Sequence, residues 1–216
     1  MKVEIYSDVA CPWCYVGEKR FEAALAEFAG ADGVEVVFRP FQLDPTASET
    51  GVPLTKYLER RFGTPVGDKL AHSTASAAGE GIVMNWDRVI SANTRNAHRL
   101  SGLALREFGA PVQRALVEAL FDAYFTKGLN VADLDVLSDL AASVGIDRER
   151  ASAYLDSTEG VLEFQTDLAE AANLGVSSVP TFVFDGQYAV EGAQSTSTFA
   201  QVLQEVAQRS AVLTEK

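Results

Sequence analysis

Residues 3–14 read Val3-Glu4-Ile5-Tyr6-Ser7-Asp8-Val9-Ala10-Cys11-Pro12-Trp13-Cys14, a short apolar run that leads into a Cys-x-x-Cys pair. A helical pattern follows as far as Phe28, because Phe21, Leu25 and Phe28 recur at the spacing of one helix face. The stretch therefore predicts a strand and then a helix, with the cysteines at the junction between them. They are the only cysteines in the 216 residues.

A Cys-x-x-Cys pair at such a junction is typical of redox chemistry. The N-terminus of a helix carries unpaired N–H groups and partial positive charge, which stabilise a thiolate on Cys11. Pro12 suits the first helical position, where its missing N–H costs nothing. The spacing lets Cys14 reach Cys11 and close a disulfide that another dithiol can exchange with. We therefore expect Cys11 and Cys14 to be a redox-active pair.

Two other interpretations of the cysteines stay open. The pair can be half of a zinc site, but such sites usually have four ligands, and His72 and His98 lack paired spacing. A purely structural disulfide is the second alternative, although a chain of this length can bury a core without one. We expect no metal and no cofactor, since the sequence shows no metal, flavin or nicotinamide motif.

Composition limits the classes of partner. The net charge of −12 argues against nucleic acid or an anionic membrane surface. No apolar stretch approaches the roughly 20 residues that span a bilayer. The chain begins directly on a predicted strand and shows no secretory signal. We therefore expect a cytoplasmic protein without a nucleic-acid or membrane partner.

Three segments are predicted along the chain. Residues 1–44 contain strand, helix and a second strand over Val34–Phe41, and residues 45–159 are almost entirely helical. Residues 160–216 return to strands. Because each terminal segment is too small to bury a sheet alone, we expect one split α/β domain with a large all-helical insertion.

Local signals refine this outline. Asp185-Gly186 predicts the turn of a hairpin, and Ser195 and Ser197 precede a last amphipathic helix. Within the later part of the chain, Asp147 is expected to cap a short helix, and Ser157 is expected to start a longer one.

Val179-Pro180-Thr181 stands directly before the hairpin, where a proline fits either a cis peptide facing the cysteines or a trans residue opening a strand. With this stretch (SSVPTFVFDGQYAVEGAQ, residues 177–194), the CPWC opening and the helical insertion, the chain resembles the DsbA-like thioredoxin superfamily, within it the FrnE-type oxidoreductases. The resemblance implies a thioredoxin fold with a large all-helical insertion. It also implies Cys11 as an exposed nucleophile, Cys14 as the resolving cysteine and Pro180 as a cis-proline opposite them.

The resemblance also implies the substrate contacts. The backbone of Val179 would pair with a bound peptide or thiol substrate as an added strand, and Pro12 and Trp13 would lie beside it. The helix that follows Asn93 would line the groove facing the cysteines, so Asn93 and His98 are candidate contacts. For His98 the alternative is a packed or capping residue.

We expect a thiol–disulfide oxidoreductase that exchanges the Cys11–Cys14 pair with a protein or small-molecule thiol, glutathione being one candidate. Asp8 is a candidate for proton transfer to the resolving thiol, or else a loop or cap residue. Similar motifs with serine in place of Cys11 occur in 2-hydroxychromene-2-carboxylate isomerases and kappa-class glutathione transferases. One alternative is therefore a glutathione-dependent isomerase or transferase acting on an aromatic small molecule. Another is a redox-linked peptide-binding module of chaperone type.

Overall fold

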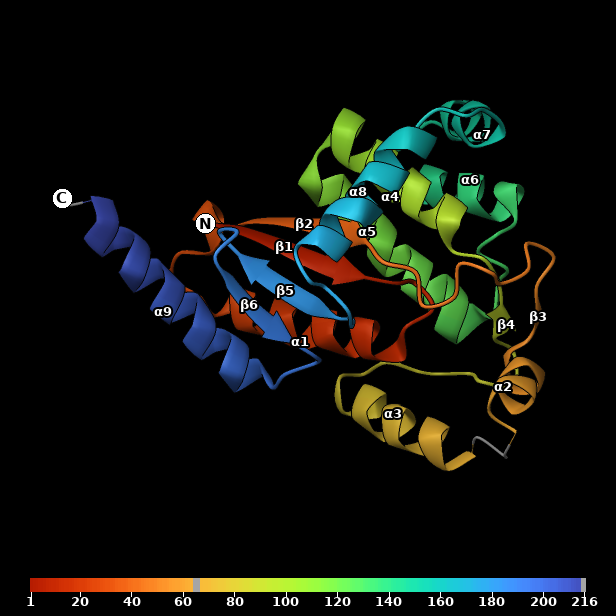
Figure 1. Ribbon diagram of the computed structural model, residues 1–216, viewed down its shortest axis with the longest axis horizontal. Coiled ribbons are helices and arrows are strands. Elements are labelled where there is room, and N and C mark those ends of the chain that lie inside the picture. The colour runs from red at the N-terminus through yellow and green to blue at the C-terminus, as the bar shows by residue number, and fades with distance from the viewer. Residues whose placement is uncertain (64–66, 215–216) are drawn as a thin grey trace.

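The computed structural model describes residues 1–63 and 67–214. Its centre is a four-stranded sheet in the order β2-β1-β5-β6 (Figure 1). β1 and β2 are parallel, β5 is antiparallel to β1, and β6 is antiparallel to β5. The strands are β1 (Lys2–Ser7), β2 (Glu35–Pro40), β5 (Thr181–Phe184) and β6 (Tyr188–Glu191). The two ends of the chain therefore share one sheet, as the sequence predicts.

Helices cover both faces of this sheet. α1 (Pro12–Ala26) and α9 (Thr196–Thr214) pack together on one face. There Phe21 lies between Phe182 of β5 and Phe199 of α9, with ring centroids 5.4 and 5.6 Å away. All three rings are fully buried, and burial of each contributes roughly 1.5–3 kcal/mol. The other face carries α4 (Arg95–Phe108), α5 (Ala110–Phe121) and α8 (Val161–Asn173), which contact β2.

The segment between β2 and α8 is mostly helical, but it also holds a two-stranded antiparallel sheet in which Val52 is opposite Ser91. The prediction of an almost entirely helical segment missed these strands, because each is only two residues long and shows no periodicity. The boundaries near residues 44 and 159 stay predictions. The elements are β3 (Val52–Pro53), α2 (Leu54–Phe62), α3 (Gly67–Gly79), β4 (Ile90–Ser91), α4, α5, the π-helical turn η2 (Asp122–Lys127), α6 (Leu134–Ser143) and α7 (Arg148–Asp156), while the short turn η1 (Ala31–Gly33) precedes β2.

The predicted helix cap at Asp147 and the predicted turn at Asp185-Gly186 are confirmed, and the predicted helix start at Ser157 is wrong. Asp147 caps α7 by accepting the N–H of Arg150. Asp185 and Gly186 both have positive φ, 48° and 66°, as a tight hairpin turn requires. Ser157 does not start α8, which begins at Val161. The hydroxyl of Ser157 instead donates to the carbonyl of Tyr154 at the end of α7, and its carbonyl accepts from Arg99 of α4.

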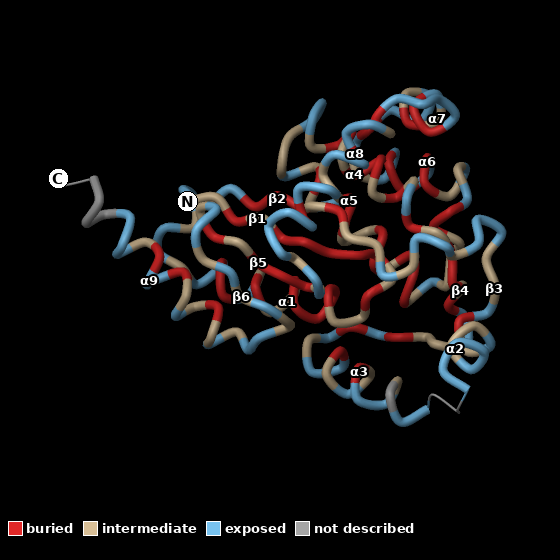
Figure 2. The backbone as a smooth tube through the Cα atoms, in the orientation of Figure 1, coloured by how far each residue is buried: buried red, intermediate tan, exposed pale blue. Residues whose placement is uncertain are grey.

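A buried glutamine protects the edge strand β2. The side chain of Gln113, on α5, accepts the N–H of Phe38 and donates to its carbonyl, each at 2.9 Å. An unpaired strand edge invites association with other chains, so this contact closes the edge. In Figure 2 most residues of β1, β2 and β5 are buried, and further buried residues lie in the helices of the insertion. Among residues 1–63 and 67–214, no helix combines the length and apolar character needed to cross a bilayer.

Arg99 of α4 binds the end of α7 and the segment that leads from α7 to α8. Its buried guanidinium donates to backbone carbonyls in the last turn of α7 and directly after it, those of Tyr154, Leu155, Ser157 and Glu159. We expect Arg99→Met to lower the free energy of unfolding by about 3 kcal/mol, because buried carbonyls lose their donors. Urea denaturation measures this. The control is Arg106→Met on the same helix, where the surface pair with Glu159 should contribute less than about 1 kcal/mol; equal losses would contradict this role.

Candidate active site

The Cys-x-x-Cys pair lies at the start of α1, directly after the loop that follows β1. Cys11 is the N-cap residue with extended backbone (φ −96°, ψ 111°), and Pro12 opens the helix. The carbonyl of Cys11 accepts the N–H of Cys14 at 3.1 Å, and the N–H of Cys11 donates to the carbonyl of Asp8 at 3.0 Å. The predicted junction is therefore confirmed.

Both cysteines are reduced and buried, with 4% exposure at Cys11 and 2% at Cys14. The expectation of an exposed Cys11 is wrong, because the loop before β5 covers it. The Cys11 thiol donates to the carbonyl of Val179, with sulfur and oxygen 3.8 Å apart.

Pro180 lies close to α1 at Gly17, a position without a side chain. The Val179–Pro180 peptide bond is cis. A Cβ atom added at Gly17 would lie 3.1 Å from Cγ of Pro180 and 3.3 Å from Cα of Ala193. Glycine at this position thus lets α1 pack directly on the loop that carries Pro180. The fold places Val179 and Pro180, about 170 residues away in sequence, beside Cys11 and α1.

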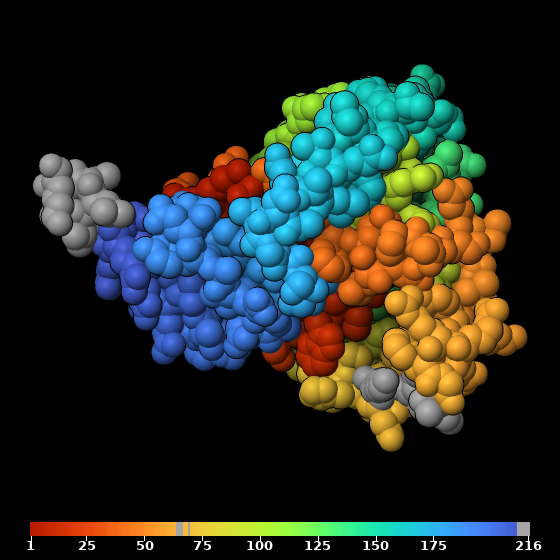
Figure 3. All heavy atoms as spheres, in the orientation of Figure 1, coloured from red at the N-terminus to blue at the C-terminus, as the bar shows by residue number. Residues whose placement is uncertain are grey.

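Pro12 and Trp13, between the cysteines, are half-buried. The ring of Trp13 meets the exposed His72 of α3 edge-on, with centroids 5.1 Å apart. From the sequence, His72 was considered only as a possible zinc ligand, and the structure places it beside the motif. In Figure 3 part of the N-terminal segment is visible in a hollow between the C-terminal segment and residues 40–60.

The surroundings of Cys14 favour the protonated form of its thiol. Burial raises the pKa of the Cys14 thiol well above its ordinary value, and the Cys11 sulfur raises it further. The backbone N–H of Asp8 and the hydroxyl of Ser7 lower this pKa. Ser7 was assigned no role from the sequence, because only the fold shows its hydroxyl beside Cys14.

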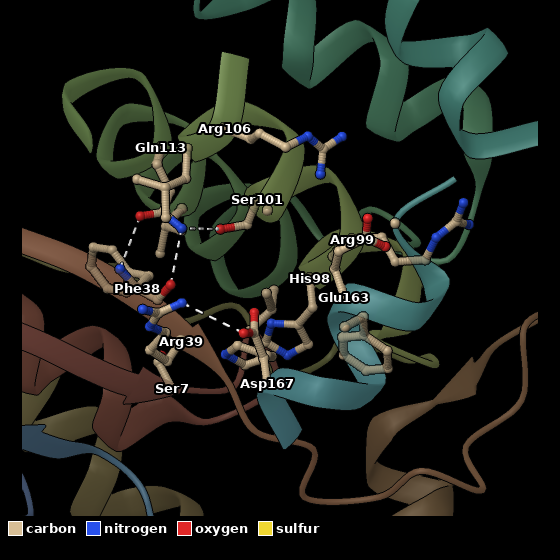
Figure 4. Close-up of a pocket in the computed structure, with 18 of the residues that line it drawn as sticks. Ser7, Phe38, Arg39, His98, Arg99, Ser101, Arg106, Gln113, Glu163 and Asp167 are labelled. Carbon is tan, nitrogen blue, oxygen red and sulfur yellow. Dashed lines mark hydrogen bonds and ion pairs between the residues drawn. The ribbon is translucent and has the colours of Figure 1, made fainter. Parts of the chain in front are cut away.

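The carboxylate of Asp8 is buried, and both of its oxygens have polar partners. It accepts the N–H of Leu43 at 2.7 Å and that of Ala10 at 3.4 Å, and it lies 3.2 Å from Nε2 of His98. The His98 ring stacks on Phe164 of α8, and both line an internal cavity of about 50 Å³ (Figure 4). His98 thus lies behind the loop that carries Asp8, and a role for His98 as a substrate contact stays a prediction.

Asn93 holds the loop after β2. Its Nδ2 donates to the carbonyls of Pro45 and Ala47, both at 3.1 Å, and its Oδ1 accepts the N–H of Arg95. These bonds orient the loop that borders the active site through Leu43. A direct contact of Asn93 with substrate stays a prediction.

A groove of about 240 Å³ opens beside Ala10, the residue before Cys11. Apolar side chains dominate its lining, and the Arg61 guanidinium contacts both Asp44 and Tyr57 within it. The sequence did not predict this groove, because its walls come from separate elements of the insertion. The lining residues are Asp8, Ala10, Leu43, Asp44, Ala47, Leu54, Tyr57, Leu58, Arg61, Phe62, Ser91, Ala92, Thr94 and Tyr124.

The sheet order, the paired cysteines at the start of α1 and the proline loop opposite them define a DsbA-like thioredoxin protein. The chain belongs to the DSBA-like thioredoxin domain family, whose sequence profile matches residues 2–204. Within the described residues, no group of three or more His, Cys, Asp or Glu side chains is placed to hold a metal ion.

Known proteins of similar sequence and structure agree with this family. A probable DsbA oxidoreductase, SCO1869 of Streptomyces coelicolor, is 37% identical, with a TM-score of 0.88 over 96% of this chain and 90% of that chain. YwbO, an uncharacterised protein of Bacillus subtilis, is 27% identical over 93% of this chain and 94% of its own length. The cytosolic disulfide reductase DsbM of Pseudomonas aeruginosa, solved with GSH, shares the fold at 17% identity and a TM-score of 0.68, over 96% of this chain and all of that chain.

Proposed function

We propose that this member of the DsbA-like oxidoreductase family exchanges its cysteine pair with the disulfide of a protein or small-molecule substrate. The Cys11 thiolate attacks the substrate disulfide, so that a bond from Cys11 to one substrate sulfur forms and the other sulfur leaves as a thiolate that takes up a proton. Cys14 then loses its proton and attacks Cys11. The Cys11–Cys14 disulfide forms, the second substrate thiolate leaves, and two electrons have passed from the protein to the substrate.

The observation that carries this proposal is the asymmetry of the two thiols. Cys11 is the N-cap residue of α1, whereas Cys14 lies one turn further into the helix, where burial raises the pKa of its thiol. The carbonyl of Val179, beside the Cys11 sulfur, offers a backbone partner to an extended substrate. The narrower FrnE-type assignment and a cytoplasmic location, where a reducing pool would maintain the dithiol, belong to the same proposal.

Alkylation tests the asymmetry directly. We expect iodoacetamide at neutral pH to modify Cys11 well before Cys14, because each unit by which a thiol pKa exceeds the ambient pH lowers its thiolate fraction about tenfold. Fragment-ion mass spectrometry of the peptide that contains both residues assigns the label. The unfolded protein is the control, since both thiols should react alike in it. Preferential labelling of folded Cys14 would reverse the roles.

The groove beside Ala10 favours a second candidate, a glutathione-dependent isomerase or transferase for an aromatic small molecule. Its apolar walls suit the body of such a substrate, and the relative DsbM, solved with GSH, supports glutathione as a candidate partner of this chain. Insulin reduction and glutathione conjugation assays, run side by side, separate the two candidates. Insulin reduction without conjugation supports the oxidoreductase, and the reverse result supports the second candidate.

A further inference from the structure

Ser7, the last residue of β1, has a buried hydroxyl without an assigned task. The residue is 3% exposed, and its Oγ has no hydrogen-bond partner of normal geometry in the part of the chain that the structure describes. Leaving a buried hydroxyl unpartnered costs roughly 1–3 kcal/mol. Such a group is expected to gain a partner in some other state of the protein.

That partner is available at Cys14. The Ser7 hydroxyl lies near enough to lower the pKa of the Cys14 thiol, which means that it favours the thiolate. A thiol accepts a hydrogen bond only weakly, but a thiolate accepts one strongly. The hydroxyl therefore fits the intermediate in which Cys14 has lost its proton better than it fits the resting dithiol.

Ser7 also belongs to the wall of the cavity that His98 lines (Figure 4). At about 50 Å³ the cavity is large enough for ordered water, which needs roughly 10–15 Å³ per molecule on this measure. The lining extends to the exposed Glu163 of α8, so the cavity leads from Ser7 toward the surface. The charged and titratable groups around the cavity are Arg39 of β2, His98, Arg99 and Arg106 of α4, Tyr154 of α7, and Glu163 and Asp167 of α8, with Asp8 behind His98.

We propose that Ser7 is a positioning residue of the resolving step, and that Cys14 gives up its proton past Ser7 into the cavity where the Asp8–His98 pair lies. The inference rests on the proposed thiol–disulfide exchange. The proton leaves the Cys14 sulfur, the Ser7 hydroxyl donates to the thiolate that remains, and the thiolate displaces the substrate sulfur from Cys11. Water in the cavity carries the proton on to the Asp8–His98 pair, whose carboxyl oxygen and Nε2 lie 3.2 Å apart.

Single-turnover reaction with dithiobis(nitrobenzoate) separates the two chemical steps. Attack by Cys11 releases a first equivalent of coloured thionitrobenzoate, and attack by Cys14 on the resulting mixed disulfide releases the second. We expect Ser7→Ala to slow the second phase about tenfold relative to the first at neutral pH. The pH midpoint of the second phase should move up by about one unit, the size expected when a charged group loses one hydrogen-bond donor.

Three further variants test whether the effect depends on the Ser7 hydroxyl and on the route to His98. Ser7→Thr keeps a hydroxyl and should restore most of the second phase. Ser101→Ala removes a buried hydroxyl from the same cavity wall, where Ser101 accepts from Gln113, and should leave both phases as in the unmodified protein. His98→Gln should slow the second phase and flatten its pH dependence. Combined with Ser7→Ala it should add little, because both act on one route.

Several results would overturn the inference. One is an unchanged pH midpoint in Ser7→Ala, and another is an equal slowing at every pH, which indicates a structural role. Full additivity of the Ser7 and His98 effects would also contradict a shared route. Should Ser7→Ala fail to fold, His98→Gln alone decides, and an unaltered second phase in it rejects the route. An unmodified protein without any first phase would contradict the proposed function itself, and the inference with it.

Discussion

Replacing Cys11 by serine is expected to abolish disulfide reduction, while replacing Cys14 by alanine should leave a protein that forms mixed disulfides but cannot resolve them. A serine hydroxyl is not ionised at neutral pH and cannot form a disulfide bond, so the first step is lost completely. In Cys14→Ala the Cys11 thiolate still attacks, but no second thiol is present to release the substrate. The covalent complex therefore accumulates.

Insulin reduction and intact-mass measurement check these two outcomes. After incubation with oxidised glutathione, Cys14→Ala should carry one glutathione adduct and Cys11→Ser none, and the double variant is the control for adventitious labelling. Trapping in cell extract on Cys14→Ala would then identify substrates. An adduct on Cys11→Ser and none on Cys14→Ala would assign the nucleophile to Cys14 instead.

The second large effect concerns stability and pH. Glu18 lies one turn after Cys14, 2% exposed, and its Oε2 has no partner among the described residues. Burial raises the pKa of Glu18 to about 8 from an ordinary 4.5. Between these pH values the unfolded chain releases a proton that the folded chain keeps, so the free energy of unfolding falls as the pH rises and levels off above about 8. At about 1.4 kcal/mol per pKa unit the whole contribution is about 5 kcal/mol.

Urea denaturation at pH 5 and pH 8 measures this contribution. Glu18→Gln should be more stable relative to the unmodified protein at pH 8 than at pH 5, by several kcal/mol, because glutamine does not ionise. The matched control is Glu27→Gln, an exposed glutamate at the end of the same helix, which should shift both values alike. If Glu18→Gln behaves like this control, the Glu18 carboxyl ionises in the folded protein as it does in water.

The sequence was sufficient for several features that depend on neighbouring residues. The strand before Cys11, the helix that Pro12 opens and the turn at Asp185 all follow from local patterns, and the structure confirms them. The cover over Cys11 could not be predicted, because the carbonyl of Val179 reaches it only through the fold.

The groove and the cavity could not be predicted from the sequence for the same reason. Tyr57 and Tyr124 are ordinary helix residues in sequence, and they share a wall only because the insertion folds back on itself. Ser7 likewise became a candidate once its hydroxyl was found buried beside Cys14.

The shielding of Cys11 by the Val179 loop is absent while the chain is being synthesised. Cys11 is synthesised well before Val179, which shields its sulfur and follows 168 positions later. At about 5–20 residues per second, the ribosome needs roughly 10–30 s to add that stretch. β1 cannot pair with β5 before then, so the nascent chain exposes two reactive thiols throughout this interval. The rate of translation thus sets how long oxidants and foreign disulfides have access to a pair that the finished protein encloses.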